Sequence, residues 1–180
     1  MRIIILDRDG VINYDSPAYI KSPAEWRPIP GSLDAIARFT RAGYRVMIAS
    51  NQSGLGRGLF DVPALDTIND ELRARLASLG GRIDAIFYCP HLPSDGCDCR
   101  KPEPGLFWQI AALPGVNLRE ALAVGDSLRD LQAAASAGVE TALVRTGNGA
   151  RTEETGDVPA GVRVFDDLAA VADHYLFRAN

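Results

Sequence analysis

The chain is poor in lysine, and it has no long apolar run. Only two of its 19 basic residues are lysines, Lys21 and Lys101. The formal net charge of -4 argues against the broad basic surface that nucleic acids or anionic membranes require. No apolar stretch approaches the roughly 20 residues of a membrane helix, and the first residues lack the pattern of a secretion signal. We therefore expect a cytoplasmic protein with neither nucleic-acid nor membrane partners.

Cysteine is also scarce, and its distribution excludes a disulfide framework. The three cysteines lie between residues 89 and 99, and an odd number in one cluster fits a metal site better than disulfides. Three thiolates and one imidazole, the donor set of structural zinc, come from Cys89, His91, Cys97 and Cys99. We predict a structural Zn²⁺ that fixes the loop before Arg100 and Lys101. Reduced core thiols beside a surface histidine are the alternative.

Apolar runs alternate with helical patterns along the chain. Strands are expected at Ile3–Leu6, Arg45–Ala49, Ala85–Tyr88, Ala121–Val124 and Thr141–Val144, with an edge strand at Val162–Val164. Helices are expected near 32–42, 63–79, 104–112, 128–138 and 166–175, and a mobile polar loop at 146–161. Continuously apolar strands joined by helices predict a mainly parallel, three-layer α/β sheet. A length of 180 residues predicts one domain, residues 1–180.

Two aspartates directly follow the first predicted strand. Asp7 and Asp9 point the same way across an extended step, so both can reach one phosphorus–oxygen bond. Asp7 would attack phosphorus to form an aspartyl-phosphate, and Asp9 would protonate the leaving group and then activate water. The first step needs a protonated Asp9, so we expect burial or a neighbouring carboxylate to raise its pKa. A helix cap or an ordinary turn is the alternative for these acids.

Further acids follow a later strand, at the edge where parallel sheets bind ligands. A divalent cation relieves the repulsion between a carboxylate and a phosphate, and Mg²⁺ prefers oxygen ligands. We predict that Mg²⁺ binds Asp7, the carbonyl of Asp9 and Asp126. Asp130, one helical turn after Asp126, would orient a metal-bound water or Lys101. The last two acids could also cap a helix, and both roles can hold together.

Ser50 and Lys101 complete the predicted catalytic set. The Ser50 hydroxyl and the amides after it are expected to hold phosphate oxygens without adding charge. Lys101 would neutralise the charge that develops at phosphorus and orient Asp7. A solvated surface lysine is the alternative for Lys101.

Together these residues resemble the haloacid dehalogenase (HAD) superfamily of phosphohydrolases. Four fragments in order carry the resemblance across nearly the whole chain: Asp7-Arg-Asp-Gly, Ser50-Asn-Gln-Ser, Arg100-Lys-Pro and Gly125-Asp-Ser-Leu-Arg-Asp. The resemblance implies a Rossmann-like HAD fold, and Asp9 marks the phosphatases rather than the dehalogenases. The intervals between the fragments leave no room for a cap domain, so loops alone should cover the active edge.

The cysteine spacing is similar to that of a capless, zinc-containing branch of the superfamily. This branch contains heptose-1,7-bisphosphate 7-phosphatases and histidinol-phosphate phosphatases. Because the sequence shows no second catalytic domain, we expect the former: a monomeric phosphatase of a small phosphorylated sugar that feeds lipopolysaccharide precursor synthesis. A histidinol-phosphate phosphatase is the alternative, and intact catalytic acids disfavour a silent zinc-stabilised binding module. Substrate contacts are expected from Asp15, Tyr19, Asn51, Gln52, Ser53, Arg57 and Arg100, in which the arginines suit a second phosphate.

Overall fold

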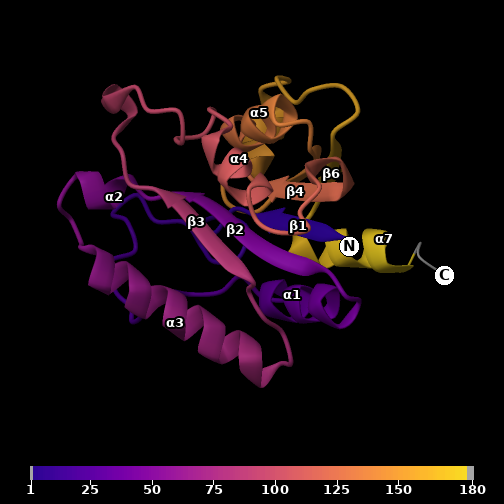
Figure 1. The fold of residues 1–180 in the computed structure, drawn as a ribbon, viewed down its shortest axis with the longest axis horizontal. Helices are drawn as coiled ribbons and strands as arrows, with labels where there is room; N and C mark the ends of the chain where they lie inside the picture. Colours follow the sequence, from indigo (N-terminus) through magenta and orange to yellow (C-terminus); the bar gives the residue numbers. More distant parts are fainter. Residues whose placement is uncertain (1, 178–180) are drawn as a thin grey trace.

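The computed structural model describes residues 2–177 and contains one six-stranded sheet. The spatial order is β3-β2-β1-β4-β5-β6, and all neighbouring strands are parallel, as predicted (Figure 1). The strands are β1 (Ile3–Leu6), β2 (Arg45–Asn51), β3 (Ala85–Cys89), β4 (Ala121–Gly125), β5 (Glu140–Val144) and β6 (Arg163–Phe165). Their carboxyl ends therefore meet at one edge of the sheet.

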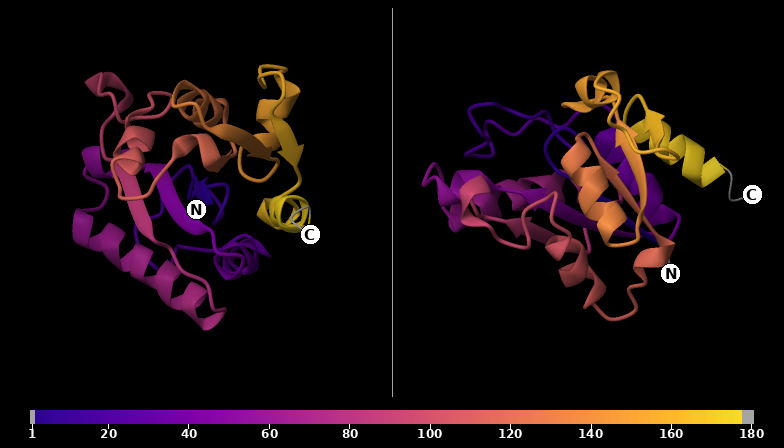
Figure 2. Two further views of the ribbon diagram at one scale, coloured as in Figure 1. Left: turned by 45° about the vertical axis from the view of Figure 1, so that its right-hand side comes forward. Right: turned by 90° about the horizontal axis from the view of Figure 1, so that it is seen from above.

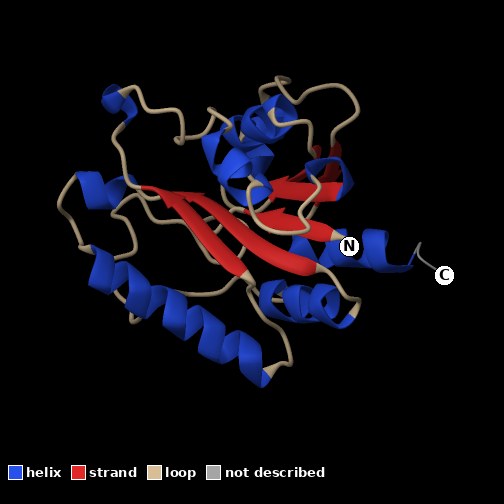
Figure 3. Ribbon diagram, viewed as in Figure 1, coloured by secondary structure: helices blue, strands red, loops and turns tan. Residues whose placement is uncertain are grey.

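Helices cover both faces of this sheet (Figure 3). One face packs against α1 (Ser32–Arg41), α3 (Val62–Ser78) and α7 (Leu168–Phe177), and the other against α4 (Gly105–Ala111) and α5 (Leu128–Ser136) (Figure 2, left). Within β1, Ile4 and Leu6 belong to the first core, and Ile3 and Ile5 to the second. Burying each of these side chains stabilises the fold by about 1.5–3 kcal/mol, so the two cores fix the strand register and the residues that follow each strand.

The expected boundaries of the longer elements agree with the structure to within two residues. Four short elements were not predicted: α2 (Ser53–Gly56), α6 (Gly149–Glu154) and the 3₁₀ turns Pro93–Asp95 and Leu118–Glu120. The expectation that 146–161 is a mobile polar loop is wrong for residues 149–154, because they form α6. The Thr152 hydroxyl of α6 donates to the Asp126 carbonyl, which ties this segment to the end of β4.

No helix or strand is inserted between β1 and α1 in the described chain. Residues 7–31 form a loop in which Asn13 makes isolated bridges to Asp9 and to Pro28, and Ile20 and Trp26 are buried. Loops therefore cover the carboxyl edge of the sheet without a cap domain, as predicted. Within residues 2–177, no helix combines the length and apolar character that a membrane span needs.

Candidate active site

Three carboxylates and one lysine converge at the carboxyl edge of the sheet. Asp7 follows β1, Asp126 follows β4, and Asp130 lies in the first turn of α5; one oxygen from each lies within 4.8 Å of the others. Lys101 Nζ lies 3.1 Å from Asp7 Oδ1 and 2.7 Å from Asp130 Oδ1, and it donates to the Ala49 carbonyl at 2.8 Å. All four charged residues are buried, so these interactions are little screened by solvent.

The amino end of α5 aims Asp130 at Lys101. The main-chain amide of Ser127, the N-cap residue, donates to Asp130 Oδ2 at 3.0 Å, which leaves Oδ1 for the lysine. Gly125 allows this close approach, because a Cβ at that position would collide with the Asp130 side chain. Asp130 therefore both caps the helix and orients Lys101.

The loop after β5 holds Asp126. Asn148 donates from its main chain at 2.8 Å and from its side chain at 3.1 Å, both to Asp126 Oδ2. Gly10 and Gly147 pack against the same carboxylate with φ values of 85° and 59°, and a Cβ at either would collide with it. Asp126 Oδ1 has no hydrogen-bond partner among residues 2–177. Asn148 was not predicted as a site residue, since its only sequence signal is a Gly-Asn-Gly turn.

The crowding of these acids perturbs their ionisation. Burial raises the pKa of Asp7 to about 6, although the Lys101 charge opposes the shift. Burial, followed by the charges of Asp7 and Asp130, raises the pKa of Asp126 to about 8. Burial alone would lower the pKa of Lys101, but Asp130 and Asp7 raise it above its ordinary value. A divalent cation fits this oxygen set, because it would offset the excess negative charge and give Asp126 Oδ1 a partner.

Asp9 lies in a separate hydrogen-bond network. Its Oδ1 accepts from Arg8 Nε at 3.1 Å and from Asn13 Nδ2 at 2.8 Å, and its Oδ2 accepts from Arg8 at 3.0 Å and from Gln52 Nε2 at 2.9 Å. Burial alone would raise the pKa of Asp9, but the Arg8 charge and these hydrogen bonds bring it below its ordinary value. The expectation of a raised Asp9 pKa is therefore wrong for this arrangement, because it left out the neighbouring guanidinium.

The predicted site residues at the end of β2 and just after it have different partners. The buried Ser50 hydroxyl accepts from Gln52 Nε2 at 2.8 Å. The side-chain amide of Asn51 instead pairs twice with the main chain of Lys101, each time at 3.0 Å. Asn51 therefore connects β2 to the lysine segment, while Ser53, also buried, begins α2.

A cavity of about 230 Å³ opens beside Asp7 and Asp9, the two aspartates predicted to be catalytic. Asp15 and Tyr19 of the 7–31 loop contribute to its wall, and Tyr19 adopts a φ of 63°, which residues other than glycine rarely adopt. Its lining residues are Asp7, Arg8, Asp9, Asp15, Ser16, Pro17, Tyr19, Ile20, Ser50, Asn51, Gln52, Ser53, Arg100 and Arg129. All predicted catalytic and substrate-binding residues except Lys101 and Arg57 thus border one space.

The arginines around this cavity only partly match the prediction. Arg100 lines it and donates to the His91 carbonyl at 3.2 Å. Arg57 is exposed outside the lining, with its guanidinium 5.9 Å from the ring centre of Tyr19. Arg129 lines the cavity but was not predicted. Its position inside the fragment Gly125-Asp-Ser-Leu-Arg-Asp, in the first turn of α5, was the available signal.

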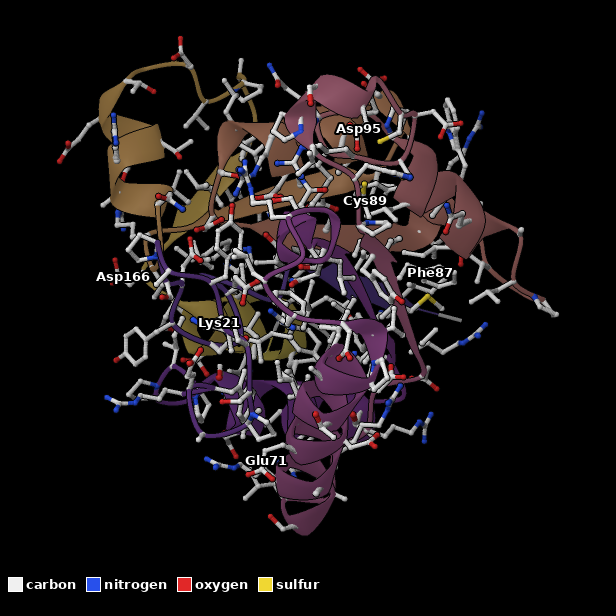
Figure 4. The ribbon with its side chains drawn as sticks, turned by 90° about the vertical axis from the view of Figure 1, so that its left-hand side faces the viewer. Lys21, Glu71, Phe87, Cys89, Asp95 and Asp166 are labelled. Carbon is white, nitrogen blue, oxygen red and sulfur yellow. The ribbon has the colours of Figure 1, made fainter. Side chains whose placement is uncertain are left out.

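The cysteine cluster forms a second centre beside this edge. The Sγ atoms of Cys89, Cys97 and Cys99 lie 3.2–3.7 Å apart, and His91 Nδ1 lies 3.5 Å from Cys89 Sγ and 3.2 Å from Cys99 Sγ. A tetrahedral zinc with Zn–S bonds of about 2.3 Å separates its sulfurs by about 3.8 Å, so the four donors fit zinc. Figure 4 shows Cys89 near Asp95 of the loop that follows β3. Arg100 and Lys101 come directly after Cys99, the last of these four residues.

Comparisons with known proteins identify the family to which this chain is similar. A HAD-hydrolase-like family model matches residues 98–171. The D-glycero-beta-D-manno-heptose-1,7-bisphosphate 7-phosphatase of Bordetella bronchiseptica is 58% identical over 99% of this chain and 100% of its own length. The enzyme of the same name from Pseudomonas putida is 52% identical over 96% of this chain and 98% of its own length.

Solved structures agree with these relatives. The crystal structure of the D,D-heptose 1,7-bisphosphate phosphatase of B. bronchiseptica, complexed with magnesium and phosphate, superimposes with a TM-score of 0.96, at 57% identity and over 99% of both chains. That of Burkholderia thailandensis gives a TM-score of 0.78, at 43% identity and over 98% of this chain and 99% of its own. The chain therefore belongs to the D-glycero-beta-D-manno-heptose-1,7-bisphosphate 7-phosphatase family of HAD-like hydrolases.

Proposed function

We propose that this chain hydrolyses the 7-phosphate of D-glycero-β-D-manno-heptose 1,7-bisphosphate and releases the 1-phosphate. The observation that carries the proposal is the buried Asp7–Lys101–Asp130 cluster beside a cavity that Arg100 and Arg129 also line. The names of the relatives support this choice of substrate. The reaction belongs in the cytoplasm, in the synthesis of heptose precursors of lipopolysaccharide, and a monomer should suffice because one chain supplies all of these residues.

In this proposal Asp7 is the nucleophile. Its Oδ1 accepts from the Arg8 amide at 2.7 Å and lies 3.1 Å from Lys101 Nζ, so two donors fix the carboxylate while it attacks phosphorus. An aspartyl-phosphate forms and splits hydrolysis into two displacements. Lys101 and the Ser50 hydroxyl stabilise the charge that develops on the phosphoryl oxygens.

Asp9 transfers protons in both displacements. It gives a proton to the leaving sugar oxygen in the first step and takes one from the attacking water in the second. The four donors around the Asp9 carboxylate favour its ionised form, which suits the second step. The first step requires a protonated Asp9. The negative charge of the bound phosphate ester would raise the pKa of Asp9 and so favour this form.

Mg²⁺ completes the site. Asp7, the carbonyl of Asp9 and Asp126 would hold it, and Asp130 would keep Lys101 in place beside them. When bound, the cation supplies positive charge that reduces the repulsion between Asp7 and the substrate phosphate. Asn148 and the two flanking glycines contribute by fixing the Asp126 carboxylate.

The second phosphate would be recognised by arginine. Arg100 and Arg129 both line the cavity, and guanidinium groups bind phosphate through paired hydrogen bonds. Asp15 and Tyr19, which line the same cavity from the 7–31 loop, would contact the sugar. A cationic substrate such as histidinol phosphate would meet these arginines unfavourably.

The substrate assignment predicts a strong preference for the bisphosphate. With Mg²⁺ present, kcat/KM for heptose 1,7-bisphosphate should exceed that for histidinol phosphate by at least about 100-fold, because the second compound leaves the arginines without a partner. Phosphate release from both compounds under identical conditions measures the ratio. A higher value for histidinol phosphate would overturn the assignment, and inactivity on a broad panel of phosphate esters would favour a binding module.

We also propose that Cys89, His91, Cys97 and Cys99 hold one structural zinc. Protein washed with a weak chelator should retain roughly one zinc per chain, and Cys99→Ser should lose most of it and melt at a lower temperature. Elemental analysis and thermal unfolding measure both effects. Ser94→Ala, an exposed change in the same loop, is the matched control and should keep the metal. Wild-type protein without zinc would contradict the proposal.

A further inference from the structure

Arg8 is a buried arginine to which the proposed reaction gives no direct role. Its side chain is about 3% exposed, and it donates to both oxygens of Asp9 and to Gln52 Oε1 at 3.1 Å. A buried ion pair is weak evidence for stability, because removing the charges from water offsets their attraction. The pairing of Arg8 with Asp9 therefore calls for an explanation in the reaction.

The remaining guanidinium nitrogen of Arg8 is further evidence that stability does not explain the Arg8–Asp9 pair. NH1 is buried without a hydrogen-bond partner in the described part of the chain. A buried donor without a partner lowers stability. The position of the guanidinium therefore allows its hydrogen bonds to Asp9, although it leaves NH1 unpaired and so lowers the stability of the fold.

Gln52 links the same carboxylate to the phosphoryl site. Its Nε2 donates to Asp9 Oδ2 at 2.9 Å and to Ser50 Oγ at 2.8 Å, and Ser50 is the hydroxyl proposed to hold phosphoryl oxygens. With Asn13 as a further donor, four hydrogen bonds hold the ionised Asp9 carboxylate, and one of them must break when Asp9 carries the proton for the leaving oxygen. The orientation of Asp9 is therefore set relative to Ser50.

We propose that Arg8 and Gln52 are positioning residues that aim the Asp9 carboxyl at the leaving oxygen of the substrate. The inference rests on the proposed function, in which Asp9 donates its proton to that oxygen as the phosphorus–oxygen bond breaks. Proton transfer requires donor and acceptor within about 2.6–3.2 Å. Because Gln52 also contacts Ser50, the phosphoryl group and the proton donor are placed by one network. Loss of either positioning residue leaves the acid present but misaligned.

The dependence of rate on the leaving group tests this role. Arg8→Met and Gln52→Met should lower kcat for simple alkyl phosphates at least about tenfold more than for 4-nitrophenyl phosphate, whose leaving group needs little protonation. For Arg8→Met, KM should change little, because Arg8 is not assigned to substrate binding; Gln52 is an expected substrate contact, so the Gln52→Met variant is compared by kcat alone. Arg8→Lys should recover part of the loss, since one ammonium can bond one Asp9 oxygen. Each variant is assayed with Mg²⁺ after its thermal unfolding has been measured.

Two further variants separate the explanations. Arg82→Met removes an exposed arginine–aspartate pair, Arg82 to Asp84 at 3.2 Å, and should leave the leaving-group dependence unchanged. Asp9→Asn should show the full dependence. If Asp9→Asn slows all esters equally, the acid role in the proposed function fails, and the inference fails with it. If Asp9→Asn behaves as expected but Arg8→Met and Gln52→Met slow all esters equally, only the positioning inference is overturned.

Discussion

Asp7→Asn is expected to abolish turnover while the protein still folds and keeps its zinc. The asparagine has nearly the same shape as the aspartate, and its amide cannot form the aspartyl-phosphate. Removal of a nucleophile should lower kcat by about 10⁴-fold or more, measured as phosphate release from heptose 1,7-bisphosphate with Mg²⁺. Asp66→Asn, at an exposed position of α3, removes one negative charge elsewhere and should retain full activity. Substantial hydrolysis by Asp7→Asn would exclude Asp7 as the nucleophile.

The same variant reports on the charge crowding at the site. Burial raises the pKa of Asp7 from 3.8 to about 6. An acid with a raised folded-state pKa loses stabilisation as the pH rises from its unfolded value through its folded value. Asparagine does not ionise and therefore does not lose this stabilisation. Without added Mg²⁺, the melting temperature of Asp7→Asn should rise relative to that of the wild type as the pH increases from 4 to 7. A constant difference over this range would show that Asp7 is not strained by its neighbours.

The parts of the fold that depend on local patterns could be predicted from the sequence. The continuously apolar runs at Ile3–Leu6 and Ala121–Val124 become central strands, because both faces of these strands are buried. The positions of Asp7 and Asp126 follow directly, since residues after parallel strands meet at one edge. The clustering of Cys89, His91, Cys97 and Cys99 could also be predicted, because their short spacing in the sequence limits how far apart they can lie.

The contacts that depend on loop conformation could not be predicted. Arg8 and Asp9 would point to opposite sides of a regular strand, yet their side chains pair. The chain turns there: the Arg8 carbonyl accepts from the amide of Ile12 at 2.8 Å, and Gly10 adopts a positive φ of 85°. The lowered pKa of Asp9 follows from this turn, which sequence spacing alone did not indicate. Asn148 contacts Asp126 because of the conformation of the loop after β5, which the sequence pattern also did not predict.

Lys101→Met should remove activity and also destabilise the protein. Lys101 Nζ contacts Asp7, Asp130 and the Ala49 carbonyl, so its loss leaves two buried carboxylates without their cation. Breaking a buried pair in this way costs about 3–5 kcal/mol of unfolding free energy, and losing the charge at phosphorus should lower kcat by at least about 100-fold. Urea unfolding and steady-state kinetics measure the two effects. Lys21→Met is the matched control, because Lys21 is half exposed beside Glu25, and it should change neither.

A double variant distinguishes lost charge compensation from lost packing. Lys101→Met combined with Asp130→Asn should recover part of the stability, since one of the two uncompensated carboxylates is removed, but none of the activity. The pH dependence gives an independent check. Lys101 opposes the effect of burial on Asp130 and holds its pKa below 3.8, so the stabilisation by this pair is present above pH 3.8 and disappears as the pH falls through the lowered pKa. The stability difference between wild type and Lys101→Met should therefore shrink on acidification. A difference that is independent of pH and of Asp130 would mean that the methylene stem of Lys101, rather than its charge, stabilises this edge of the sheet.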